Sequence, residues 1–186
     1  DKIMKLKNNL LFRMEFFGGI IINKVTFDRL ELTFDEALFI RASEFLSIEN
    51  SEKLVCKILN KNHINISRLY ELQLFQSTET TPIDYDTVYS LLESEYKKIK
   101  GTPSLSFPLE ITIYPSMKCN LNCKFCFLGN KSDKKIWDAE HWGKLIEEAK
   151  NNGLLSVSIL GGEPALYYDI DNLLRKCESL KINTII

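Results

Sequence analysis

The sequence lacks a long hydrophobic run, an excess of one charge and a framework of paired cysteines. No apolar stretch approaches the roughly 18 residues of a membrane-spanning helix, and Arg13 and Glu15 interrupt the N-terminal one. The 24 basic and 25 acidic side chains nearly cancel, so no strong field for nucleic acid or an anionic membrane is expected. The five cysteines, three of them close together, suit a metal site in a reducing compartment better than secreted disulfides. We therefore expect a cytoplasmic protein with no nucleic-acid or membrane partner.

The first part of the chain, residues 1–77, is predicted to be a small α+β unit with the order of a winged helix. Apolar runs separated by turn residues predict three strands, and helical periodicity predicts three helices after them. Thr33 and Glu36 have the spacing of a capping box, which marks the start of the first helix. The expected elements are, in order, residues 10–17, 19–23, 26–32, 33–46, 52–59 and 66–75.

Residues 78–107 are predicted to be a linker that carries one bridging helix. The segment "STETTPIDYD" is polar, and Thr81-Pro82 would cap and open the helix, because proline suits the first helical position. The helix should end at Gly101. Its expected apolar stripe consists of Val88, Leu92, Tyr96 and Ile99.

From residue 108 onward strands and helices alternate. This order predicts a βαβαβ unit with a parallel sheet. Parallel strands need cover on both faces, so we expect residues 108–186 to be the first part of a larger α/β fold, either a TIM-like partial barrel or an open sheet. The expected strands are 109–114, 154–160 and 182–186, and the expected helices are 138–153 and 168–180.

Three cysteines, Cys119, Cys123 and Cys126, follow the first of these strands. Chemistry in α/β folds gathers in such loops, and closely spaced thiolates favour zinc, Cu(I) or an iron–sulfur cluster. A structural zinc would need a fourth ligand, for which His141 is the candidate. The other readings are a [4Fe–4S] cluster and a chance grouping of three cysteines.

The C-x3-C-x2-C spacing, with Phe125 before the last cysteine and "GGEP" after the next strand, resembles the radical S-adenosylmethionine (SAM) superfamily. The resemblance covers residues 108–186. It implies that the three thiolates hold a [4Fe–4S] cluster whose fourth iron takes the amino and carboxylate groups of SAM. It also implies that Phe125 lies near the adenine, and that a short motif holds the methionine ammonium. This motif consists of Gly161, Gly162, Glu163 and Pro164.

Each of these motif residues also has a purely structural reading. The glycines permit close approach of a ligand to the backbone, but they equally suit a tight strand-to-helix turn. Glu163 would be favoured at a helix start whatever it binds, and the structural reading of Phe125 is packing beneath its own loop. Both readings are open at the level of the sequence.

The segments "FFGGIIIN" and "FDRLELTFDEALFI" resemble the precursor-peptide recognition domain of ribosomal peptide maturases. This resemblance implies that a leader peptide adds as a strand between the third strand and the third helix. A DNA-reading winged helix is disfavoured, because "ISRLYELQLF" offers few cations. A purely structural wing is the other reading. The implied peptide contacts are Asp28, Arg29, Leu30, Glu31, Leu32, Arg68, Leu69 and Leu72.

Together the two resemblances imply a SPASM-type radical SAM maturase that modifies a ribosomal precursor peptide and needs an external electron donor. Thioether formation to cysteine is the modification that the resemblance suggests first. The expected barrel is unfinished, and only Cys56 and Cys177 remain for a second cluster, so we expect the chain to be catalytically incomplete. The alternative is a non-catalytic peptide-binding module on a zinc-stabilised scaffold.

Overall fold

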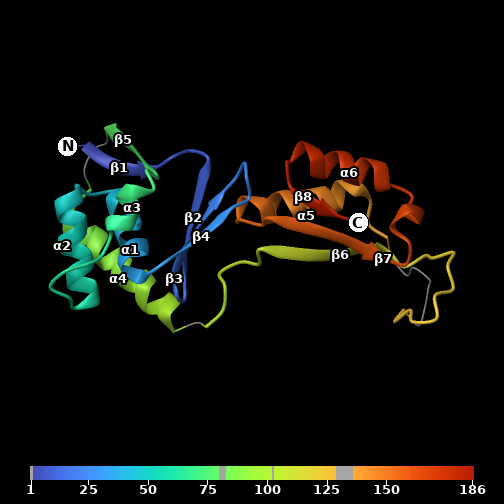
Figure 1. Ribbon diagram of the computed structural model, residues 1–186, viewed down its shortest axis with the longest axis horizontal. Coiled ribbons are helices and arrows are strands. Elements are labelled where there is room, and N and C mark those ends of the chain that lie inside the picture. The colour runs from blue at the N-terminus through green and yellow to red at the C-terminus, as the bar shows by residue number, and fades with distance from the viewer. Residues whose placement is uncertain (1, 80–82, 102, 129–135) are drawn as a thin grey trace. The chain divides into compact units, whose positions relative to one another are not determined.

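The computed structural model describes residues 2–79, 83–101, 103–128 and 136–186 (Figure 1). The chain forms two compact units, one over residues 1–106 and the other over residues 107–186. None of the helices in the described ranges combines the length and the apolar character that a membrane span requires.

Two antiparallel sheets make up the β part of the first unit. β2 (Leu10–Glu15), β3 (Gly18–Asn23) and β4 (Arg29–Leu32) pair in that order, which puts β4 at an edge. These three strands were predicted, with somewhat wider limits. β1 (Lys2–Leu6) pairs with β5 (Phe75–Glu79) in a second sheet that was not predicted.

The third helix is shorter than expected. α3 (Ser67–Glu71) ends before Gln73, which adopts a left-handed φ of 48°. The chain then enters β5, where the ring of Phe75 lies 6.3 Å from that of Phe39 in an edge-to-face contact. The second half of the helix predicted over residues 66–75 is therefore wrong. The chain leaves the helix to form β5, which pairs with β1, and local periodicity cannot show a pairing with a strand so far earlier in the sequence.

The first two helices supply most of the core of this unit. In α1 (Phe34–Ser43) the predicted capping box is confirmed: the Thr33 amide donates to the Glu36 carboxylate over 2.9 Å, and the Glu36 amide donates back to the Thr33 hydroxyl over 3.4 Å. α2 (Ile48–Leu59) begins earlier than expected, because the side chain of Ser47 caps it. Buried residues of both helices pack with β3 and β4 in one cluster.

α4 (Tyr85–Lys100) packs onto the same core. It begins after Asp84, whose carboxylate accepts a 3.0 Å hydrogen bond from the Thr87 amide. The prediction that Thr81-Pro82 opens this helix is therefore wrong, and residues 80–82 themselves lie outside the described ranges. Val88 and Leu92 are fully buried in the first unit, so the helix assigned to a linker is part of this unit. It ends at Gly101, as predicted.

The second unit has the predicted alternation of strands and helices. β6 (Glu110–Ser116), β7 (Ser156–Gly161) and β8 (Asn183–Ile185) form a parallel sheet in that order. α5 (Ala139–Asn151) and α6 (Ile170–Ser179) connect them and lie on one side of the sheet (Figure 1). Between β7 and α6 lies a short 3-10 helix, η1 (Pro164–Leu166).

Only one face of this parallel sheet is covered in the described part of the chain. Ile113, Val157 and Ile159 are buried beneath the two helices. On the opposite face Tyr114 and Leu160 are 43% and 40% exposed. Successive strand residues point to opposite faces, so the exposed pair marks a face that has no covering layer among the described residues.

Candidate functional site

The three clustered cysteines lie in the loop that leaves the C-terminal end of β6. Cys119 is partly buried, while Cys123 and Cys126 are exposed, and none forms a disulfide. The sulfur of Cys119 accepts a hydrogen bond from the amide of Leu121 (3.4 Å). The amide of Cys126 donates to the carbonyl of Cys123 (3.2 Å). Local turns therefore contribute to folding the described part of this loop.

The cysteine loop carries a donor set that fits an iron–sulfur cluster, although its side chains do not converge. Within the described ranges, no three His, Cys, Asp or Glu side chains come together as a metal site requires. The loop nevertheless presents three free thiols, and thiolates are the ligands that iron–sulfur clusters use. For the zinc alternative, Nδ1 of His141 pairs with the Asp138 carboxylate over 2.6 Å, an arrangement that leaves Nε2 as the metal donor.

The "GGEP" loop is joined directly to the start of the cysteine loop. The Gly162 amide donates to the Ser116 carbonyl (3.1 Å), and the Glu163 amide donates to the Lys118 carbonyl (2.8 Å). A Cβ on Gly161 would lie 2.1 Å from the Ser116 oxygen, and one on Gly162 would lie 2.1 Å from the Lys118 oxygen. Both glycines are thus required by the contact between two segments of this chain, whatever else they bind.

Glu163 caps the short helix that follows. One carboxylate oxygen accepts a 3.2 Å hydrogen bond from the amide of Ala165, and Pro164 occupies the first turn. This is the structural reading of Glu163, and it holds the carboxylate at the same end of the sheet as the cysteine loop. There a negative charge is suited to an ammonium ligand.

Tyr167 supports this end of the sheet and was not singled out from the sequence. Its side chain is buried, and its hydroxyl donates a 2.6 Å hydrogen bond to the carbonyl of Trp137. Burial raises the pKa of the Tyr167 phenol far above its usual value, so it remains a donor. The bond ties η1 to the segment before α5, and no local sequence pattern indicates such a pairing.

The exposed fractions of Phe125 and Cys177 decide between their structural and functional readings. Phe125 is 92% exposed, so it does not pack beneath its own loop and its ring is open to a ligand. Phe127, which the sequence analysis passed over, is 80% exposed beside it. Cys177 is buried in the core, where burial raises its pKa, and Cys56 lies in α2 of the first unit.

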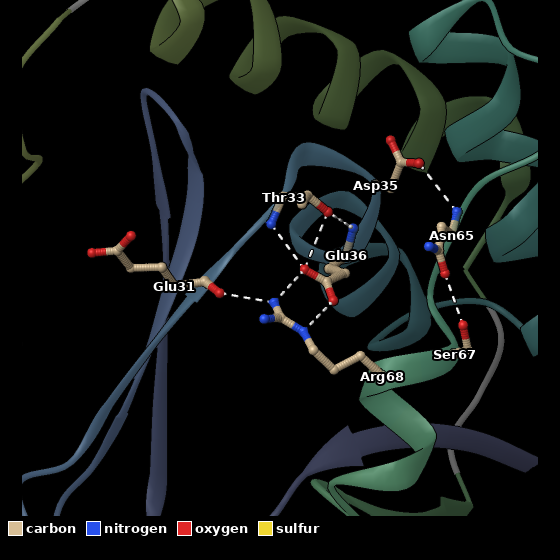
Figure 2. A network of polar contacts seen from close by, with 7 residues as sticks. All are labelled: Glu31, Thr33, Asp35, Glu36, Asn65, Ser67 and Arg68. Atoms are coloured by element: carbon tan, nitrogen blue, oxygen red, sulfur yellow. Dashed lines mark hydrogen bonds and ion pairs between the residues drawn. The ribbon is translucent and has the colours of Figure 1, made fainter.

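In the first unit, Arg68 links α3 to α1 and to the edge strand β4 (Figure 2). Its Nε and Nη2 donate to the two oxygens of Glu36 over 2.9 and 2.7 Å, and Nη2 also donates to the carbonyl of Glu31 over 2.9 Å. Burial alone would raise the pKa of Glu36, but hydrogen bonds from Arg68 and Thr33 outweigh it and hold the pKa below its usual value. Glu36 thus caps its helix and fixes Arg68 at once.

The predicted peptide contacts are only partly on the surface. Leu32 and Leu69 are 2% and 0% exposed, so their side chains belong to the core and are withdrawn from the candidate contacts. Leu72 is 45% exposed. Of the others, Asp28, Arg29, Glu31 and Arg68 are exposed and Leu30 is partly buried. A polar hollow of about 490 Å³ lies beside them, lined by residues of α1, α3 and the segment between α2 and α3.

We expect Glu36→Gln to flatten the acid sensitivity of the first unit. A carboxyl whose folded pKa is depressed stabilises the fold above its unfolded pKa of about 4.3, and this stability is lost as the pH falls through the folded pKa. The variant should also lose about 1–2 kcal/mol at neutral pH, because Arg68 loses charge-assisted bonds. Urea unfolding between about pH 7 and pH 3 measures both effects.

The matched control is Glu178→Gln in α6, which removes an exposed carboxyl from the second unit. It should leave the acid sensitivity of the first unit unchanged. An equal pH dependence in the Glu36→Gln variant and the unsubstituted protein would contradict the role given to Glu36.

Comparisons with known proteins agree with this geometry. Residues 113–186 match the profile of the radical SAM superfamily. SuiB of Streptococcus suis, crystallised with its precursor peptide SuiA, is 40% identical and has a TM-score of 0.67 over 98% of this chain and 42% of SuiB. A second SuiB structure, bound to S-adenosylmethionine, has a TM-score of 0.68 at 40% identity over 98% of this chain and 41% of SuiB.

Two groups of curated relatives match a smaller part. A PqqA peptide cyclase of Methylobacterium nodulans is 31% identical over 42% of this chain and 21% of its own length. A probable GTP 3′,8-cyclase of Methanococcus aeolicus is 33% identical over 41% of this chain and 26% of its own length. The chain therefore spans about a quarter of these relatives and about two fifths of SuiB. Its cysteine and "GGEP" loops fall within residues 113–186, the part of the chain that matches the radical SAM superfamily.

Proposed function

We propose that this chain carries the peptide-recognition unit and the beginning of the radical SAM unit of an enzyme that modifies a ribosomally made precursor peptide. The observation that carries the proposal is the similarity to SuiB, which extends over 98% of this chain and so includes both units. The GTP cyclases match only about two fifths of it. A peptide is therefore a better-supported substrate class than a nucleotide.

In this proposal the second unit is the start of a partial barrel, and its loops hold the cofactors. Cys119, Cys123 and Cys126 would ligate three irons of a [4Fe–4S] cluster, and Glu163 with the "GGEP" backbone would take the ammonium of SAM. Phe125 would lie against the adenine. When bound and reduced by an external donor, the cluster supplies the electron for reductive cleavage of SAM. The hydrogen bonds from the Gly162 and Glu163 amides to the Ser116 and Lys118 carbonyls support this proposal, because they join the two loops at one end of the sheet.

The first unit would act as a winged-helix-like leader-binding domain. β4 is an edge strand, and an edge strand offers unpaired backbone groups to an added peptide strand. The exposed side chain of Leu72 in the turn after α3 would contact the peptide's apolar residues. The crystal structure of SuiB with its precursor peptide supports a peptide partner.

The proposed modification is a new bond between two side chains of the peptide. Thioether formation to cysteine is the modification proposed first, and a link between two other side chains is the competing outcome. Each would remove two hydrogen atoms from the peptide, but only the thioether would protect a cysteine from alkylation. Mass spectrometry before and after alkylation distinguishes them.

We expect the protein, purified anaerobically with iron and sulfide, to be brown and to bind SuiA. In its full-length form it should cleave SAM to 5′-deoxyadenosine when a strong reductant is added. The readouts are visible absorbance, iron and sulfide content, and chromatography of the SAM products. A colourless zinc protein that leaves SAM intact would favour the non-catalytic binding module instead.

A further inference from the structure

The open edge of β4 offers fewer backbone groups to an added strand than its four residues suggest. The Asn23 amide donates to the Asp28 carbonyl over 2.8 Å, in the same register as the neighbouring pairs of β3 and β4. Hydrogen-bonded and non-hydrogen-bonded pairs alternate along an antiparallel ladder. The backbone groups of Leu30 and Leu32 therefore face β3, and those of Arg29 and Glu31 face the open edge.

One of these outward groups is already occupied. The carbonyl of Glu31 accepts the 2.9 Å hydrogen bond from Arg68, while the side chain of Glu31 points away from Arg68 (Figure 2). Thr33 follows as the N-cap of α1, and its amide is taken by Glu36. A carbonyl can accept two hydrogen bonds, but the guanidinium of Arg68 lies against the outward-facing carbonyl of Glu31, where the amide of an added strand would come. The groups left for an added strand without this obstruction are the amide and carbonyl of Arg29 and the amide of Glu31.

Arg68 is held too firmly to be displaced by a peptide. Two of its hydrogen bonds go to the carboxylate of Glu36, whose side chain is only 5% exposed. Charge-assisted bonds of this kind are roughly twice as strong as the neutral bond that a peptide amide would make to Glu31. Moving Arg68 would also leave the buried charge of Glu36 without its cation.

We propose that Arg68 ends the part of β4 along which a peptide strand can pair, and that it thereby sets the register of the bound peptide. We call this role a strand stop. An added strand donates one amide to β4, to the carbonyl of Arg29. The peptide amide two residues away, which would otherwise reach the carbonyl of Glu31, makes no bond to the strand. This holds for a parallel and for an antiparallel peptide, because either direction places alternate amides toward β4. The inference rests on the proposed leader-binding role of this unit.

The test is a backbone N-methyl scan of SuiA, in which each amide in turn carries a methyl group. Binding to the full chain is measured by calorimetry. With the unsubstituted protein, methylation at a single peptide position should weaken binding by about tenfold or more. The methyl group removes one hydrogen bond and enters the space between the peptide strand and β4. The position two residues away toward Glu31 should change affinity less than about twofold.

The double variant Glu36→Gln/Arg68→Gln removes both charges, so neither is left buried alone. The carbonyl of Glu31 becomes available, and a second sensitive position should appear two residues from the first. Arg68→Lys is the second variant should the double variant unfold. Lysine keeps a cation for Glu36 but lacks the planar fork that also reaches Glu31, so the same new position is expected. Arg175→Gln, which removes an exposed guanidinium from α6, should keep the single-position pattern.

The outcomes separate the two claims. Two sensitive positions in the unsubstituted protein would overturn the role of Arg68 and leave the peptide site intact. No binding of SuiA would overturn the proposed leader-binding function, on which this inference rests. Binding of SuiA with no sensitive position would leave that function intact and overturn strand addition on β4 and the role of Arg68. One position before substitution and two after it support the strand stop.

Discussion

Cys123→Ser should abolish cluster assembly and reduce the SAM cleavage of the full-length protein by more than about a hundredfold. Loss of an outer partner of a metal ligand already costs about 10–100-fold, and a serine hydroxyl is a poor substitute for a soft thiolate ligand. Cys123 is exposed and lies in a loop that local turns fold. The substitution should therefore leave the fold unchanged. Iron and sulfide analysis, visible absorbance and 5′-deoxyadenosine formation measure the effect.

Cys56→Ala provides the matched control. Cys56 lies in α2 of the first unit, whereas the cysteine loop belongs to the second. Its variant should retain the full iron and sulfide content and the same SAM cleavage. Normal cluster content in Cys123→Ser, or an equal loss in both variants, would show that the loop is not the cluster site.

Gly161→Ala should destabilise the second unit by about 2–6 kcal/mol. The φ of Gly161 is +141°, a conformation that costs a residue with a Cβ about 1–3 kcal/mol. The new methyl group would lie 2.1 Å from the Ser116 carbonyl oxygen, which is backbone and cannot swing aside. Overpacking of that kind adds about 1–3 kcal/mol. Hydrogen exchange of the β6 and β7 amides should accelerate markedly.

Gly101→Ala serves as the comparison for this change. Gly101 ends α4, its φ is −81°, and a Cβ there would have its nearest neighbour at 3.6 Å. Alanine at such a position should alter stability by less than about 1 kcal/mol. Unchanged exchange of β6 and β7 in Gly161→Ala would mean that the contact between the two loops can relax without cost.

Local patterns were enough where neighbouring residues decide the structure. The capping box of Thr33 and Glu36 and the end of α4 at Gly101 were predicted correctly, because each depends on residues a few positions apart. The alternation of strands and helices after residue 108 was likewise predicted. The C-x3-C-x2-C spacing indicated the superfamily, since that chemistry is concentrated in one short loop.

Long-range contacts decided the rest. The pairing of β1 with β5 ended α3 early, and packing of Val88 and Leu92 drew α4 into the first unit. Burial of Leu32 and Leu69 removed two candidate peptide contacts, and Arg68 closed one backbone group of β4.

The sequence by itself indicated the kind of chemistry, because the three cysteines and the "GGEP" turn that carry the resemblance lie in two short segments. Only the tertiary structure decided which groups are open to a ligand. Exposure and hydrogen-bond occupancy depend on segments that meet in space, such as the carbonyl of Glu31 and the guanidinium of Arg68, and no local pattern contains that information.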